Sequence, residues 1–319
     1  ICAYEFQTAT SNSLRINFKG LDMASKSRPL VSIGIPTYNR ASTLKKTLDS
    51  LVCQTYDNIE IIVSDNCSPN DETEKVVRSF SDRDNRVKYY KQEENLGLYY
   101  NFKFVFDVSK GDYFTWTADD DSRSEKYIEA CMTVFEELDD SSQVILVNSF
   151  SSLLDKQSDE IIKVDRGCNT VGLQPAKRYY KYLKSIYTSQ ASVGDLIYGV
   201  IRRKSAQEAF DTQPNILSWD HIFLANLALK GEFYTIPEKL MDSAPGGASS
   251  AKDVDKMARV QLIENQFFIK RARWARMLFL QKLVHSSNKL SPIDKLILIV
   301  WVFYDTAFRL VTQKIPSKQ

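Results

Sequence analysis

The sequence contains few of the residues that build several common kinds of functional site. Only two of its 319 residues are histidine, His221 and His285, which excludes a three-histidine metal centre. The five cysteines are scattered and form no CxxC pair, so we expect free thiols in a reducing compartment. Eleven glycines and nine prolines exclude a collagenous or low-complexity chain. A metal used by this protein must therefore be bound mainly by carboxylates.

An excess of charge of one sign is also lacking. Lys and Arg total 42 against 40 Asp and Glu, which leaves a net charge of +2. Nucleic-acid binding needs a basic field, so we expect no nucleic-acid partner. Hydrophobic residues make up 43% and charged residues 26% of the chain, which is typical of a globular protein with a sizeable core.

Long apolar runs are missing as well. A transmembrane helix requires roughly 20 apolar residues, and a secretory signal needs a basic segment followed by an apolar stretch. Neither is present, although Leu296–Tyr304 is a shorter unbroken apolar run. Segment 289–314, which contains it, carries flanking lysines and arginines and is expected to contact a membrane peripherally, as an interfacial helix on an anionic surface. The alternative is a buried helix that closes the core or forms a dimer contact.

The first half of the chain alternates short β-branched runs with amphipathic segments. Strands are expected near 30–36, 59–64, 87–90 and 112–117. Helices are expected to begin at Ser42 and Asp71 and to span 98–108 and 122–135. This order predicts a parallel sheet with helices on both faces. Because ligands bind at the carboxyl ends of such strands, Asp65 and Asp119–Asp121 are expected to share one crevice.

The acidic cluster needs a positive partner. Three consecutive aspartates repel one another, and their carboxylates are natural ligands for a divalent cation such as Mg²⁺ or Mn²⁺. On an extended stretch Asp119 and Asp121 would converge while Asp120 faces elsewhere. The alternative is an acidic N-terminus of the helix that follows. No GxGxxG follows the first strand and no GxxxxGK[ST] occurs, which disfavours a Rossmann dinucleotide enzyme and a P-loop nucleotidase.

Four motifs in order resemble those of family 2 glycosyltransferases of the GT-A fold. They are Val31–Arg40 (VSIGIPTYNR), Ile61–Asn66 (IIVSDN), Asn95-Leu-Gly97 followed by Asn101, and Gly111–Asp121 (GDYFTWTADDD). The resemblance is specific over 30–138 and continues more weakly to Leu240. It implies an α/β fold: a doubly wound, mainly parallel, Rossmann-like sheet over 29–240. We expect 1–28 to be a poorly ordered or non-native extension, with a short ordered extension as the alternative, and 241–319 to form a mobile loop and C-terminal helices.

The resemblance also implies roles for individual residues. Asp65 would hydrogen-bond the nucleobase, usually uracil, and Asp119 would lie near the ribose. Asp121, together with Asp119, would hold the Mn²⁺ or Mg²⁺ that bridges the diphosphate and stabilises the departing nucleoside diphosphate. The remaining residues expected to contact the nucleotide-sugar are Pro36, Thr37, Tyr38, Asn39, Arg40, Asn95 and Asp120.

The segment Leu217–Gly231 resembles the part of the family that carries the catalytic base, which places this role on Asp220. The expected reaction is inverting transfer of one sugar from a nucleotide-diphosphate sugar, with a UDP-sugar favoured, to a glycan or lipid-linked acceptor. The family's processive QxxRW motif is replaced by Lys270-Arg-Ala-Arg-Trp274, which favours single transfer.

We expect this reaction to serve surface polysaccharide or lipopolysaccharide synthesis, at a cytoplasmic location that includes the inner face of the membrane. The alternative functions are a nucleotidyltransferase and a catalytically silent sugar-nucleotide-binding protein.

Overall fold

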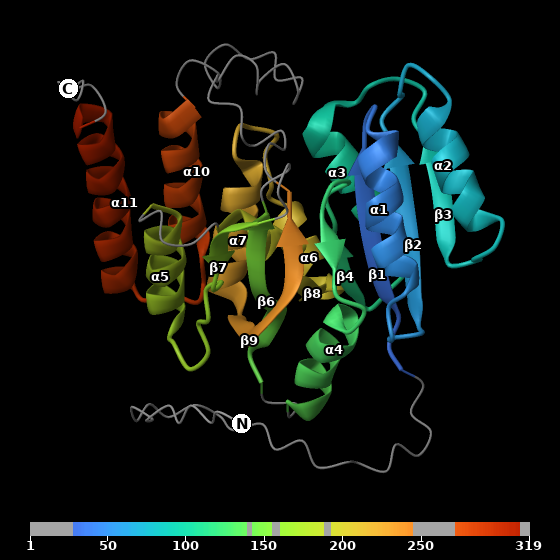
Figure 1. The fold of residues 1–319 in the computed structure, drawn as a ribbon. Helices are drawn as coiled ribbons and strands as arrows, with labels where there is room; N and C mark the ends of the chain where they lie inside the picture. Colours follow the sequence, from blue (N-terminus) through green and yellow to red (C-terminus); the bar gives the residue numbers. More distant parts are fainter. Residues whose placement is uncertain (1–27, 139–141, 155–159, 188–192, 245–271, 313–319) are drawn as a thin grey trace.

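The computed structural model describes residues 28–138, 142–154, 160–187, 193–244 and 272–312 (Figure 1). The expectations for residues 1–27 and for the loop around Gly246 and Gly247 lie outside these ranges. None of the helices in the described ranges is both long enough and apolar enough to cross a membrane.

The first half of the chain forms the predicted alternation of strands and helices. Its elements are β1 (Val31–Thr37), α1 (Ala41–Val52), β2 (Ile59–Asp65), α2 (Glu72–Ser81), β3 (Val87–Lys91), α3 (Gly97–Asp107) and β4 (Tyr113–Trp116). The strands pair in parallel in the order β3-β2-β1-β4. Every residue of β1, β2 and β4 is buried, as expected for parallel strands covered on both faces. The prediction of a mainly parallel α/β sheet is confirmed.

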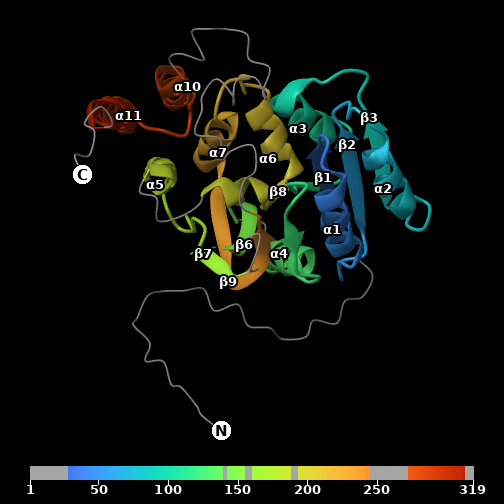
Figure 2. The same cartoon turned by 45° about the horizontal axis from the view of Figure 1, so that its top comes forward.

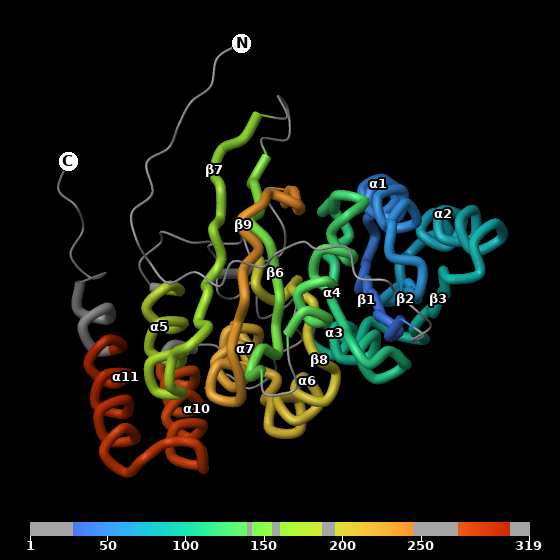
Figure 3. Tube along the Cα trace, turned by 90° about the horizontal axis from the view of Figure 1, so that it is seen from below, coloured from blue at the N-terminus to red at the C-terminus, as the bar shows by residue number. Residues whose placement is uncertain are grey.

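The second half extends this sheet with strands of mixed direction. These are β5 (Ser122–Arg123), β6 (Val144–Leu154), β7 (Ile161–Asp165), β8 (Val200–Arg202) and β9 (Glu232–Ser243). The full order is β3-β2-β1-β4-β8-β6-β9-β5, with β7 paired to β6. Figure 3 shows β6, β7 and β9 together on one side of the molecule and β1, β2 and β3 on the other. β8 is antiparallel to both of its neighbours, whereas β6 and β9 are parallel to each other. The sheet is therefore mixed but mostly parallel.

Helices cover both faces of the sheet and divide the core into two parts. The remaining helices are α4 (Tyr127–Glu137), α5 (Pro175–Tyr187), α6 (Arg203–Phe210), α7 (Trp219–Lys230), α10 (Ala272–Ser286), α11 (Pro292–Thr312) and the 3₁₀ helix η1 (Val193–Tyr198). One core contains Leu48 of α1 and Ile128 of α4. The other contains Phe106 of α3, Phe223 of α7 and Leu298 of α11, so the C-terminal helices belong to it. Figures 1 and 2 show α10 and α11 at the opposite end of the molecule from α1 and α2.

The helix predicted over 122–135 begins later, at Tyr127. Ser122 and Arg123 instead form β5, which pairs with Asp242 and Met241 of β9. This pairing joins segments that lie far apart in sequence, and no local pattern signals it. It buries the Arg123 guanidinium, which donates to the backbone oxygen of Tyr198 at 3.0 Å.

The close approach of α3 to the sheet depends on Gly34 in β1. A Cβ atom there would lie 2.7 Å from Val105 Cγ2 and 2.8 Å from Phe114 Cζ. We therefore expect Gly34→Ala to lower the free energy of unfolding by about 1–3 kcal/mol through overpacking, measured by urea denaturation. Lys46→Ala on the exposed face of α1 is the control and should change it by less than about 0.5 kcal/mol. Equal stability of the two variants would contradict this packing.

Candidate active site

Three turns at the carboxyl edge of the sheet contain most of the residues predicted for the donor site. They follow β1, β2 and β4, whose carboxyl ends meet because the strands are parallel. The turns after β1 and β2 hold Asn39 and Cys67 at φ values of 53° and 64°, and Ser218 before α7 has a φ of 60°. Non-glycine residues seldom adopt this left-handed conformation, and they concentrate at functional sites. Backbone strain thus marks both the predicted donor site and the approach to Asp220.

The turn after β1 is bound to the turn after β4, which holds Asp119–Asp121 and which we call the acidic turn. Thr37 Oγ1 donates to Asp119 Oδ2 at 2.7 Å, and Arg40 Nη1 donates to Asp119 Oδ1 at 2.7 Å. Arg40 Nη2 also lies 3.0 Å from Asp120 Oδ2. Burial raises the pKa of Asp119, whereas Arg40 and Thr37 oppose this effect. Both oxygens of Asp119 are therefore occupied by partners within the chain.

Asp65 lies at the end of β2 and is fully buried. Its Oδ1 accepts from Ser68 Oγ at 2.5 Å, and its Oδ2 accepts from Tyr89 Oη at 3.0 Å. Ser68 Oγ in turn accepts the backbone N–H of Asn39 at 2.8 Å. Asp65 thus ties the turn after β2 to the turn after β1. The described contacts give it a positioning role, and its predicted bond to a nucleobase stays a prediction.

Asparagines join the remaining parts of the donor edge. Asn95 Oδ1 accepts from Asn66 Nδ2 at 2.9 Å, which fixes the turn after β2 against the start of α3. Asn101 of α3 is buried, and its Nδ2 donates to the backbone oxygen of Ser64 at 3.1 Å. The predicted residue Tyr38 is 45% exposed, whereas Pro36 is buried in β1. The structure thus brings Asn95 to this edge and leaves the Tyr38 ring accessible.

The acidic segment is a turn rather than an extended stretch. Asp121 donates its backbone N–H to the oxygen of Ala118 at 3.4 Å, so the chain reverses at this point. As a result Asp119 and Asp120 share Arg40, and Asp121 Oδ1 instead accepts the N–H of Ala244 at 3.1 Å. The sequence analysis expected Asp119 and Asp121 to converge because alternate residues of an extended strand point the same way. Since this segment is a turn, that reason does not apply, and their shared role stays a prediction.

The charges of four carboxylates from three segments act on the buried phenol of Tyr198. Burial raises the pKa of this phenol well above its usual value, and four negative charges raise it further: Asp121, Asp195, Asp120 and Asp220. Tyr198 lies at the end of η1, and its backbone oxygen accepts from Thr115 Oγ1 at 2.8 Å. Asp220 therefore acts on the same buried phenol as Asp120 and Asp121, and its predicted role as the base stays a prediction.

Asp195 and Tyr198 are the site residues that sequence reasoning missed. Burial raises the pKa of Asp195 to about 6, although the hydroxyl of Ser151 donates to it. Burial also raises the pKa of Asp121 well above its usual value. No sequence motif surrounds Asp195 or Tyr198. The antiparallel position of β8 beside β4 places η1 against β4.

Asp220 lies in the first turn of α7, a helix buried on nearly all sides. Trp219 anchors this turn to α3, with its ring 5.4 Å from that of Tyr99. The Asp220 side chain is only partly buried and accepts no hydrogen bond from the described residues. Nδ1 of His221 lies 3.5 Å from Arg276 Nη1 of α10. Burial lowers the pKa of His221, which favours a neutral imidazole beside Asp220.

The residues of the acidic turn fit a divalent cation that the substrate also binds. Asp120 Oδ2 is buried and pairs with Arg40 Nη2 at 3.0 Å. The described part of the chain holds no group of three or more His, Cys, Asp or Glu residues that could bind a metal alone. Mg²⁺ commonly takes only one or two carboxylates and completes its shell with water and substrate phosphates. The predicted metal is therefore compatible with this site.

Comparison with known proteins identifies the family. The sequence profile of glycosyl transferase family 2 matches residues 32–210, more than half of the chain. The chain belongs to glycosyl transferase family 2. The matched range includes the acidic turn, Asp195 and Tyr198 but ends before Asp220. The resemblance predicted from the four motifs is confirmed, and with it the class of enzyme, a glycosyltransferase.

A relative of known sequence is also similar to part of this chain. An uncharacterized glycosyltransferase from Rickettsia felis is 37% identical over 118 residues, which cover 37% of this chain and 19% of that protein. The match thus spans less than a fifth of that relative's length.

Two solved structures share the fold. S. aureus TarS in complex with UDP-GlcNAc aligns with a TM-score of 0.60 at 14% identity, over 88% of this chain and 72% of that one. The mannosyltransferase PcManGT from Pyrobaculum calidifontis, in complex with GDP-Man and Mn²⁺, aligns with a TM-score of 0.50 at 16% identity, over 95% and 80%. At these identities the likeness establishes the fold alone, and the predicted GT-A fold is confirmed.

The raised pKa of Asp195 predicts a pH-dependent stability. Its folded-state pKa of about 6 exceeds the ordinary value of 3.8, so the folded protein binds the extra proton between these values. The protonated Asp195 carboxyl therefore stabilises the folded state fully below pH 3.8, and this stabilisation is lost as the pH rises through 6. Relative to wild type, Asp195→Asn should therefore gain up to about 3 kcal/mol between pH 4 and pH 7.5, measured by urea unfolding without divalent cations. A difference that does not change with pH would contradict the assignment.

Proposed function

We propose that this protein is an inverting, metal-dependent glycosyltransferase that moves one sugar from a nucleotide-diphosphate sugar to an acceptor hydroxyl. The observation that carries the proposal is the bonding of the turn after β1 to Asp119 at the carboxyl edge of the sheet, where the charges of Asp120, Asp121 and Asp220 also act together on Tyr198. A single displacement at the anomeric carbon needs donor-binding groups and a base at one site.

The donor occupies the edge formed by the turns after β1, β2 and β4. Tyr38 presents an exposed ring, and Arg40 provides a cation for the phosphates beside Asp119. Hydrogen bonds among Asp65, Ser68 and Asn39 hold the turns after β1 and β2 in place, where the nucleobase is proposed to bind. A UDP-sugar is the favoured donor, since TarS, which shares the fold, binds UDP-GlcNAc. PcManGT binds GDP-Man instead, so a donor screen includes both nucleotides.

The metal is proposed to bind at the acidic turn as Mn²⁺ or Mg²⁺. Sequence reasoning assigned it to Asp121 and Asp119. The geometry favours Asp120 with Asp121, because both oxygens of Asp119 accept hydrogen bonds from Thr37 and Arg40, whereas Asp120 pairs with Arg40 through Oδ2. When bound, the metal supplies Lewis-acid stabilisation of the departing diphosphate. The chain's own contribution is to hold these carboxylates in a buried turn that excludes water.

Asp220 is proposed to take the proton from the acceptor hydroxyl as it attacks the anomeric carbon. Its side chain is partly exposed and makes no competing hydrogen bond to a described residue. The neighbouring Trp219 fixes the start of α7 through its ring contacts with Tyr99 and Phe102 of α3. The acceptor is proposed to be a glycan or a lipid-linked sugar of a surface polysaccharide or lipopolysaccharide. No covalent enzyme intermediate is expected, because a single displacement inverts the anomeric centre.

The alternatives predict different behaviour. A nucleotidyltransferase would hold phosphates with a Gly- and Arg-rich loop after the first strand, and Pro36–Arg40 does not provide one. A silent sugar-nucleotide-binding protein would bind a donor without releasing nucleoside diphosphate. The family match favours glycosyl transfer over the first, and turnover distinguishes the second.

Asp220→Asn tests the base. In a screen of UDP- and GDP-sugars with Mn²⁺, wild type should release nucleoside diphosphate, and the variant should do so about 10²–10⁴-fold more slowly. Glu129→Gln is a matched control because it also removes an acid from the first turn of a helix, but on α4, where Glu129 pairs with Arg28 at the amino end of β1. The control should keep full activity. The mechanism fails if Asp220→Asn turns over as fast as wild type, and the silent alternative gains support if wild type binds a donor without releasing product.

Removal of the metal tests the acidic turn. A chelator should abolish nucleoside-diphosphate release, and added Mn²⁺ should restore it. Asp120→Asn should raise the Mn²⁺ concentration for half-maximal activity by at least about tenfold, because one ligand oxygen is replaced by an amide. The exposed Asp112→Asn, just before β4, is the control and should titrate like wild type. An unchanged Mn²⁺ titration of Asp120→Asn would return the metal to Asp121 and Asp119.

A further inference from the structure

One face of α11 exposes a continuous stripe of large apolar side chains, which we call the α11 stripe. Its members are between 50% and 67% exposed: Ile293, Leu296, Ile297, Val300, Phe303 and Tyr304. They follow one another at intervals of three and four residues or adjoin such positions, so they lie on one side of the helix. Leu298 and Val302 are buried and hold the opposite side against the core. The core therefore accounts for one side of this helix only.

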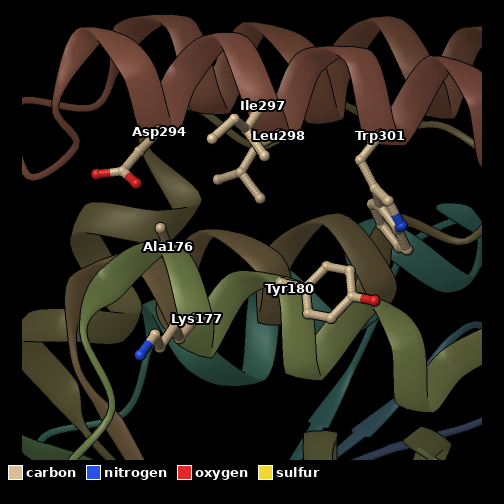
Figure 4. Close-up of a pocket in the computed structure, with 7 residues that line it drawn as sticks. All are labelled: Ala176, Lys177, Tyr180, Asp294, Ile297, Leu298 and Trp301. Carbon is tan, nitrogen blue, oxygen red and sulfur yellow. The ribbon is translucent and has the colours of Figure 1, made fainter.

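The stripe continues into a groove between α5 and α11. A cavity of about 310 Å³ opens there, and Figure 4 shows Trp301 and Ile297 of α11 above Tyr180 and Lys177 of α5. The rings of Tyr180 and Trp301 meet edge to face at 4.9 Å. Ile297 belongs to both the stripe and the groove, so the two form one apolar surface. Tyr180 is itself 39% exposed, which carries this surface onto α5.

The charges around this surface are mainly positive. Within the described residues 274–306, four basic side chains stand against two acidic ones: Arg276, Lys282, Lys289 and Lys295 against Asp294 and Asp305. Lys177 lies at the groove, and Lys282 and Lys289 are exposed on α10 and on the turn before α11. The one acid at the groove, Asp294, accepts a hydrogen bond from Ser291 Oγ at 2.6 Å. An apolar stripe within a basic region matches the chemistry of an anionic lipid surface.

We propose that the α11 stripe docks on an anionic membrane surface and inserts its apolar side chains at the boundary between headgroups and acyl chains. Tyr304 and Trp301 combine an apolar ring with a polar tip, which suits that boundary. A second copy of this chain is a poorer occupant, because pairing two such faces would bring two basic segments together. The inference rests on the surface alone and does not depend on the sugar-transfer reaction.

Vesicle sedimentation with the full chain tests the proposal. The protein should pellet with vesicles of phosphatidylcholine and phosphatidylglycerol, and much less with phosphatidylcholine alone or at high salt. The double variant Leu296→Gln/Val300→Gln should lower the bound-to-free ratio on anionic vesicles by at least about tenfold, since it removes apolar groups from the stripe. Lys177→Glu/Lys282→Glu should lower binding to anionic vesicles and leave the weak binding to neutral ones unchanged.

The matched control is Ile161→Gln/Ile162→Gln on β7, where the two side chains are 53% and 57% exposed. This control should bind like wild type, which separates the α11 stripe from general surface hydrophobicity. The proposal is overturned if wild type does not pellet with anionic vesicles, or if the α11 variant binds as wild type does. It is also overturned if light scattering shows a dimer that the α11 variant converts to a monomer, because a second copy then covers the face.

Discussion

The bond between Arg40 and the acidic turn is the contact on which the geometry of the site depends. Asp119 and Asp120 are withdrawn from water at the end of β4, which carries a large cost unless a cation and donors lie close by. Arg40 and Thr37 supply them from the turn after β1. The two turns therefore hold each other in place, and Asp65 extends the same connection to β2 through Ser68 and Asn39.

The second half of the sheet adds the chemistry that this donor edge lacks. β8 pairs antiparallel with β4 and so places η1, with Asp195 and Tyr198, against β4. β5 pairs with β9 and brings Ala244 to Asp121, which gives that buried carboxylate a donor. Parallel strands thus bring Asp65 and Asp119 to one edge, whereas the antiparallel strands position Asp195 and the backbone donor to Asp121.

The C-terminal helix α11 packs against the core on one side and exposes apolar side chains on the other. Leu298 and Val302 are as deeply buried as residues of the sheet, so α11 is held firmly. Its other side keeps an apolar stripe exposed in a basic region, a combination that a soluble surface rarely retains without a partner. The same helix therefore both closes the core and offers a surface that the fold alone does not explain.

The sequence by itself determined the local features of this protein. Apolar β-branched runs define β1 to β4, and their parallel order brings Asp65 and Asp119 to one edge, because successive strands joined by helices must run the same way. The four motifs around these strands sufficed to predict the family. Asp220 could be predicted only by resemblance, since nothing near it in sequence shows which site it approaches.

Only the tertiary structure decided the contacts between distant segments. It showed that Asp119 and Asp120 share Arg40 and that the segment carrying them is a turn. It also brought Asp195 into the site. The physical reason is that periodicity records which side of an element is buried, whereas strand pairing across the sheet sets which buried groups meet.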